Sequence, residues 1–210
     1  MKNNAPRAFV LALFAVLTAA CAANYSGGAH VVKPTQIDQT WHRAATTPVV
    51  KQHDMRDCGL AALAMVGGAW GRNWTIHELS QDVNVPDKGV KLGALRDLAR
   101  TRGLDAFAIK GRHEDLAREL ANGRPVVLGL ILPFDRKYNL AHYEVVVAYS
   151  PRDGSVITLD PANGKHMRRT KAVLEEEWKR TGYATLVVTG AKELPDAHGT
   201  AGAAGGVSAR

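Results

Sequence analysis

The spacing of apolar residues divides the chain into a helical first part and a strand-rich second part. Apolar residues at helical spacing, or helix-boundary signals such as a capping box, predict helices at residues 58–68, 75–83, 92–102, 113–121 and 171–180. Beta-branched and continuous apolar runs predict strands at residues 47–50, 105–110, 125–132, 142–149, 156–160 and 183–189. Most of the strands therefore follow the first four helices.

The later strands are joined mainly by tight turns, and Asp153-Gly154 is the strongest hairpin signal among them. Hairpins connect antiparallel strands, so the second part should form a largely antiparallel sheet. Because helices and strands are segregated along the chain, we expect an α+β fold. The N-terminal helical half should pack against one side of the sheet, and the cleft between the two halves is the expected site.

Residues 1–20 resemble a targeting segment. Lys2 and Arg7 precede an uncharged apolar run over residues 8–20, which is too short to span a bilayer and fits a secretory signal peptide. The segment ends at Thr18-Ala19-Ala20-Cys21, which resembles a bacterial lipobox in which Cys21 would be lipidated. Cleavage at the neighbouring small residues, giving a soluble periplasmic protein, is the alternative. We expect a membrane-anchored periplasmic lipoprotein.

Domain organisation follows from the same patterns. Residues 21–45 have no sustained period and are predicted to be a tether, residues 46–190 the folded domain, and the Gly/Ala-rich residues 191–210 a disordered tail. The hydrophobic content of 46% supports a proper core. The net charge of +7 is spread without a basic stripe and interleaved aromatics, which argues against nucleic-acid binding. No HExxH motif or cysteine cluster indicates a metal, and no cofactor is implied.

Cys58 stands where a polar segment turns into an apolar helix, and the only other cysteine is Cys21. With Cys21 lipidated, Cys58 is a free thiol, either buried and inert or used in chemistry. A helix N-terminus stabilises an anion by roughly 0.3–1 kcal/mol, at most about 2, which amounts to about one pKa unit. Lowering a thiol pKa from about 8.5 to about 4–6 therefore requires a partner, usually a paired imidazolium.

Among eight histidines, His142 is the best placed partner because it opens a strand after a polar loop at the rim of the sheet. His166, which follows a turn, is the rival. Hairpin pairing places Asp160 near His142, where a carboxylate can orient the imidazole, although Asp160 to Gly164 also reads as a simple turn. Gln52 and the Cys58 backbone N–H would supply two donors to an oxyanion.

These residues lie in a set of motifs that resembles the bacteriocin-leader-processing, or double-glycine, cysteine peptidases, a papain-like family. The motifs span residues 48–190 in the family's order: Gln52-x5-Cys58-Gly59-x-Ala61-x-Leu63-x-Met65, Gly89-Val90-x-Leu92-x-x-Leu95, Gly123-x-Pro125, His142-Tyr143-x-Val145-Val146 and Asp160-Pro161-x-x-Gly164. The resemblance implies a papain-like fold. It also implies Cys58 as nucleophile, His142 as base and then acid, Asp160 as its orienter, and Gln52 as oxyanion donor.

Members of that family are commonly fused to an ABC transporter and act in the cytosol. Because this sequence has an export signal but neither transmembrane segments nor a GxxxxGK[ST] loop, we expect a stand-alone exported member. Its substrate would be an exported protein or peptide, cleaved after a Gly-Gly pair as the resemblance implies, beside secretion or assembly machinery. Two alternatives stay open: another thiol-dependent acyl-transfer enzyme, such as a transamidase or cell-wall amidase, and a non-catalytic binding module that keeps the fold.

Overall fold

The computed structural model describes residues 28–133 and 139–190. The helices are α2 (Cys58–Ala69), α3 (Ile76–Gln81), α4 (Leu92–Thr101), α5 (His113–Ala121) and α6 (Lys171–Lys179), with a 3-10 turn η1 (Pro34–Gln36). The strands are β1 (His30–Val32), β2 (His42–Arg43), β3 (Asp105–Lys110), β4 (Val126–Pro133), β5 (Asn139–Tyr149), β6 (Val156–Asp160), β7 (Lys165–Arg169) and β8 (Ala184–Thr189). The prediction of an α+β, papain-like fold is confirmed.

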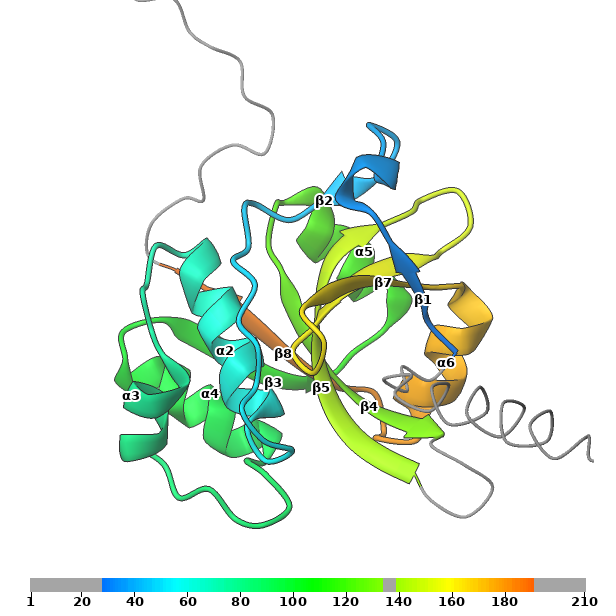
Figure 1. Ribbon diagram of the computed structural model, residues 1–210. Helices are drawn as coiled ribbons and strands as arrows, with labels where there is room; N and C mark the ends of the chain where they lie inside the picture. The colour runs from blue at the N-terminus through cyan, green and yellow to red at the C-terminus, as the bar shows by residue number, and fades with distance from the viewer. Residues whose placement is uncertain (1–27, 134–138, 191–210) are drawn as a thin grey trace, which may run out of the picture.

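All the strands belong to one antiparallel sheet in the order β1-β7-β6-β5-β4-β8-β3, with β2 pairing β5 at a separate point (Figure 1). The β4–β5 hairpin lies at the middle of this order and pairs Leu130 with His142. The β5–β6 hairpin continues on the other side and pairs Val146 with Thr158. These two hairpins place the start of β5 beside the end of β6.

Helices cover both faces of the sheet, because alternate residues of its central strands enter two different cores. Val127 and Val145 pack in the core formed with α2, α3 and α4, whereas Leu128 and Val146 pack in the core formed with α5 and α6. Figure 1 shows α2, α3 and α4 together on one side of the sheet and α6 on the other. The expectation that the N-terminal helical half packs against one side of the sheet is therefore confirmed for α2, α3 and α4 and wrong for α5. The continuous apolar run of β4 is typical of a strand buried on both faces.

The first helix of the domain, α2, is a buried element packed through small residues. Every residue from Cys58 to Gly67 is buried. A Cβ at Gly67 would come within 2.4 Å of the Trp74 ring, and one at Gly68 within 2.2 Å of Pro48. The glycines therefore let other segments pack directly on the helix backbone, which continues to Ala69 instead of ending at Gly67-Gly68 as predicted.

The prediction of a tether over residues 21–45 is wrong for residues 30–43. β1 pairs with β7 and β2 pairs with β5, so residues 30–43 are attached to the sheet. These strands have only three and two residues and depend on backbone pairing, which leaves no apolar period for sequence reasoning to detect. Residues 47–50, predicted as a strand, have no regular secondary structure.

The predicted signal peptide, Cys21 and the tail lie outside the described residues. Within residues 28–133 and 139–190, no helix has the length and apolar character needed to cross a membrane.

Candidate active site

Gly59 sets the N-terminal turn of α2 directly against β5. A Cβ at Gly59 would lie 3.2 Å from the Tyr143 ring and 3.0 Å from the Leu95 side chain, so a larger residue would have to push these side chains back. Cys58 immediately precedes Gly59, and His142 immediately precedes Tyr143. The close approach of helix and strand therefore brings the predicted nucleophile to the predicted base.

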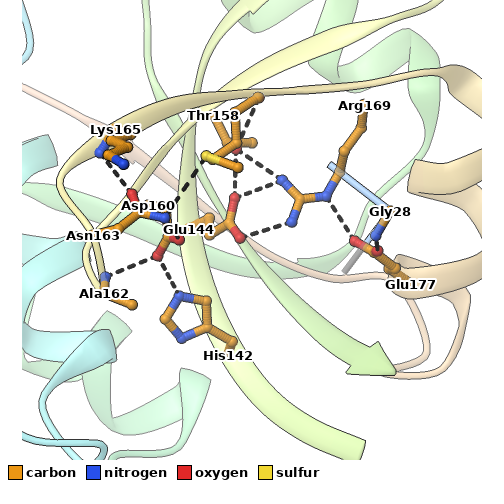
Figure 2. A network of polar contacts seen from close by, with 11 residues as sticks. Gly28, His142, Glu144, Thr158, Asp160, Ala162, Asn163, Lys165, Arg169 and Glu177 are labelled. Atoms are coloured by element: carbon orange, nitrogen blue, oxygen red, sulfur yellow. Dashed lines mark hydrogen bonds and ion pairs between the residues drawn. The ribbon is translucent and has the colours of Figure 1, made fainter. Parts of the chain in front are cut away.

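His142 and Asp160 form a buried hydrogen bond between adjacent strands. His142 Nε2 lies 2.8 Å from Asp160 Oδ1, and the two residues are 5% and 1% exposed (Figure 2). The Asp160 carboxylate accepts a hydrogen bond from Nε2–H, which leaves Nδ1 for the other partner of the imidazole, the Cys58 side chain. The structure thus joins the histidine and the aspartate that the sequence paired through the hairpin.

The turn after β6 fixes the Asp160 carboxylate. Oδ1 also accepts the Ala162 backbone N–H at 2.8 Å, and Oδ2 accepts the Asn163 side-chain amide at 2.7 Å. Gly164, at a φ of +70°, closes the turn by donating its N–H to the Asp160 carbonyl at 2.7 Å. These donors fix the orientation of the Asp160 carboxylate independently of His142. A carboxylate in a fixed orientation can hold one imidazole tautomer.

Cys58 is a buried free thiol at the first position of α2. Burial alone would lower the pKa of His142. Hydrogen bonds to Asp160 and to the Cys58 side chain, together with the negative charge of Glu144, outweigh it and raise the pKa to about 10. An imidazolium at neutral pH is the partner that a thiolate requires. The helix N-terminus adds its own positive potential at Cys58.

Gln52 is anchored to the same turn as Asp160. Its backbone N–H donates to the Pro161 carbonyl at 2.9 Å, which places the residue beside the catalytic turn. Its side-chain Oε1 is buried and has no hydrogen-bond partner among the described residues. Cys58, as the first residue of a helix, has a backbone N–H without an intrahelical acceptor. Both predicted oxyanion donors therefore belong to segments that meet at this site.

The remaining candidates do not join the site. The His53 side chain is 79% exposed and faces Asp57. His166, the rival base, lies in β7 opposite Leu159, and burial lowers its pKa. His142 therefore provides the imidazole for Cys58.

Three buried groups lie close enough to share a metal ion, with the ligand atoms of His142, Glu144 and Asp160 within 4.8 Å of one another. Both oxygens of Glu144 already accept from the Arg169 guanidinium, at 2.6 and 2.7 Å, and Asp160 accepts from His142. The positive charge of the Arg169 guanidinium at Glu144 disfavours the binding of a metal cation there. We interpret the group as a charge network, which the sequence analysis missed. A glutamate inside the apolar strand at residues 142–149 was the available signal.

The model of the Peptidase C39 family matches residues 46–192, which include the whole site. The chain belongs to the Peptidase C39 family. The family and its cysteine peptidase structures identify this member as a cysteine peptidase. The predicted resemblance to the bacteriocin-processing cysteine peptidases is confirmed at the level of the family.

Proteins similar to this C39 peptidase include a secretion/processing ATP-binding protein and the peptidase domain of an ABC transporter. The probable microcin-H47 secretion/processing ATP-binding protein MchF of Escherichia coli is 27% identical over 163 residues, which cover 77% of this chain and 20% of MchF. The peptidase domain of Streptococcus ComA, a bifunctional ABC transporter involved in a quorum sensing pathway, is 26% identical with a TM-score of 0.57, covering 69% of this chain and 99% of that domain. The chain thus spans about a fifth of the length of the curated relative.

A further solved structure shares the fold. The double glycine motif protease from an AMS/PCAT transporter, solved in complex with a leader peptide, is 20% identical with a TM-score of 0.56, covering 70% of this chain and 94% of that one. Residues 28–45, which form β1, η1 and β2, precede the region that the family model matches.

The raised pKa of His142 predicts an unusually alkaline limit for peptidase activity. Because the folded-state pKa of about 10 exceeds the ordinary 6.5, the imidazolium persists through neutral pH and is lost only as the pH rises through about 10. We expect kcat/KM to stay level from neutral pH to about 9 and then to fall. A pH–rate profile, with circular dichroism to exclude unfolding, measures this limit. A fall in kcat/KM near pH 6.5–7 in a folded sample would contradict this prediction.

Proposed function

We propose that this C39 peptidase is an endopeptidase that cleaves its substrate through a Cys58 thioester. The observation that carries the proposal is the buried His142–Asp160 hydrogen bond together with the buried free thiol of Cys58, whose side chain contributes to the raised pKa of His142. The Cys58 thiolate attacks the scissile carbonyl carbon, and the imidazolium of His142 donates its proton to the leaving amine as the C–N bond breaks. Water then attacks the thioester while His142 accepts a proton from it, and the C–S bond breaks.

Gln52 and the backbone N–H of Cys58 are assigned to the oxyanion of the tetrahedral intermediate. The Gln52 backbone is fixed by Pro161, while its side-chain Oε1 has no hydrogen-bond partner within the described part of the chain. The amide is thus not held in a structural role through that atom. Two donors aimed at a developing negative charge act most strongly in a site that excludes water.

Replacing Gln52 by Ala should lower kcat by about 10²–10³, the usual effect of losing one oxyanion donor. The KM should change little, because the donor acts on the transition state more than on the bound substrate. Lys51→Ala, a change at the exposed neighbouring residue, serves as the matched control and should leave kcat near its original value. Equal kcat values for Gln52→Ala and the original enzyme would contradict the assignment.

The substrate we propose is the leader of an exported peptide, cut after a Gly-Gly pair. The relatives are named for secretion and processing, and a structure with the same fold is a double glycine motif protease with a leader peptide. The site itself favours slender residues, because Cys58 and His142 are each only 5% exposed. Two glycines let a backbone reach a thiol that side chains would block.

A peptide series tests this specificity. Synthetic leaders that end in Gly-Gly, Gly-Ala or Val-Val before the same cargo are incubated with the full chain, and the products are weighed by mass spectrometry. We expect cleavage after Gly-Gly at least about 10²-fold faster than after Val-Val, since a misfitted side chain costs a few kcal/mol of transition-state binding. Purified peptidoglycan is incubated with the same protein in parallel. Muropeptide release without peptide cleavage would indicate a cell-wall amidase instead.

The place of action that we propose is the periplasmic side of a membrane, with a lipid on Cys21 as the anchor. The support is the sequence of residues 1–21, with its basic start, short apolar run and lipobox-like end. An enzyme held there would meet substrates beside secretion or assembly machinery. Metabolic labelling with an alkynyl fatty acid should mark the original chain and not Cys21→Ser. An unlabelled original chain recovered from the cytosol would contradict the proposal.

A further inference from the structure

A buried charge network lies directly behind the His142–Asp160 pair. Arg169 of β7 is fully buried, and its guanidinium contacts both Glu144 oxygens at 2.6 and 2.7 Å and Glu177 Oε2 at 2.6 Å (Figure 2). The Thr158 hydroxyl donates to Glu144, and Glu177 Oε1 accepts the Gly28 backbone N–H at 2.7 Å. Every charged group in the network is thus satisfied, as buried charges must be.

The register of the sheet aims this network at the catalytic histidine. His142 and Glu144 are two residues apart in β5 and so point to the same face. Because Val146 pairs with Thr158, Asp160 lies opposite Glu144. An imidazole nitrogen of His142 and one carboxylate oxygen each of Glu144 and Asp160 all lie within 4.8 Å of one another. A charge at this distance in a buried site acts strongly on its neighbour.

The charges around the imidazole do not balance. His142 is faced by Cys58 from α2, by Asp160 from β6 and by Glu144 from its own strand, and Glu144 is backed by Arg169 and Glu177 from β7 and α6. The cluster thus contains three carboxylates, those of Asp160, Glu144 and Glu177, and one permanent cation, the guanidinium of Arg169. Even with a protonated His142 the cluster keeps an excess of negative formal charge, and this excess favours the imidazolium.

We propose that Glu144 is a positioning residue for catalysis, held by Arg169 so that its carboxylate stabilises the imidazolium of His142. The proposal deepens the proposed function, since it rests on His142 as the base and acid of the reaction. Glu144 touches neither Cys58 nor the scissile bond and acts only through His142. The negative charge of Glu144 contributes to the raised pKa of His142, after the hydrogen bonds of Asp160 and Cys58.

Glu144→Gln tests the proposal, because it keeps the shape and a carbonyl acceptor for Arg169 while removing the charge. Glu177→Gln is the matched control. Glu177 is also buried and shares the Arg169 partner, but it lies outside the group around His142. The pKa of His142 is read by NMR titration of ¹³C-labelled imidazole, with its signal assigned by loss in His142→Gln. This readout needs no substrate, so the result stands even if the proposed peptidase function fails.

We expect Glu144→Gln to lower the pKa of His142 by about one unit or more, and Glu177→Gln by less than about a third of that. The alkaline limb of kcat/KM should move with it. If Glu144→Gln does not fold, the triple variant Glu144→Met, Arg169→Leu, Glu177→Leu removes the same net charge with apolar groups of similar size, which proteins often tolerate. An unchanged pKa in the variant that folds, or an equal shift in Glu177→Gln, overturns the proposal.

Discussion

Replacing Cys58 by Ala should lower peptidase kcat/KM by at least about 10⁴-fold, because removal of the nucleophile removes covalent catalysis altogether. The Cys58 side chain is small and buried, so Ala removes one sulfur atom from the interior and leaves the helix intact. Activity on a Gly-Gly leader peptide, measured with excess enzyme to reveal slow turnover, checks the expected loss.

The other cysteine of the chain supplies the control for this substitution. Purified Cys21→Ser protein should cleave the same peptide as fast as the original chain, because Cys21 precedes the region matched by the family model. A thermal melt of Cys58→Ala close to that of the original chain shows that the fold is kept. Retention of more than about a hundredth of the activity in Cys58→Ala would contradict a catalytic thiol.

Replacing Arg169 by Met should lower the free energy of unfolding by about 3–5 kcal/mol, the usual effect of removing one partner from a buried ion pair. The substitution leaves Glu144 and Glu177 buried without the guanidinium that both carboxylates share. Urea denaturation followed by circular dichroism measures the loss as a shift of the midpoint.

The neighbouring residue gives a matched comparison on the same strand. Arg168 is exposed, and its ion pair with Asp153, at 3.4 Å, lies on the surface. Arg168→Met should therefore cost less than about 1 kcal/mol. Similar losses in the two variants would mean that the buried network contributes no more than a surface ion pair.

The elements that the sequence predicted well are those with a strong apolar period. The runs that became β4, β5 and β6 lie in the middle of the sheet, and their burial on both faces makes them continuous apolar segments. β7, with the sequence Lys165 to Arg169, has mostly polar residues and was not predicted as a strand. Its pairing with β6 and β1 is a tertiary effect that no local pattern reports.

The candidate site was predictable to the extent that it depends on strand pairing. The hairpin after β5 placed Asp160 near His142, and the structure joins them. The register differs from a simple backward count, because an irregularity between Val146 and Ala148 shifts the pairing. The sequence showed Glu144 as a polar exception within an apolar strand. It did not reveal the partner, because Arg169 lies on a strand that was not predicted.

The contact between Gly59 and Tyr143 explains why a helix from the first part and a strand from the second form one site. Sequence reasoning identified both motifs but had no means of placing them at one point in space. The missing side chain of Gly59 permits this approach, and it is visible only once the ring of Tyr143 is in place.

The acyl-enzyme is the most direct test of the central claim that Cys58 attacks the peptide bond. The full chain is mixed with a Gly-Gly leader peptide, quenched in acid within a single turnover, and weighed intact by mass spectrometry. We predict a transient adduct with the mass of the N-terminal fragment of the peptide, released by hydroxylamine and mapped to Cys58. Cleavage of the peptide without any such adduct, or an adduct on another residue, would contradict the account.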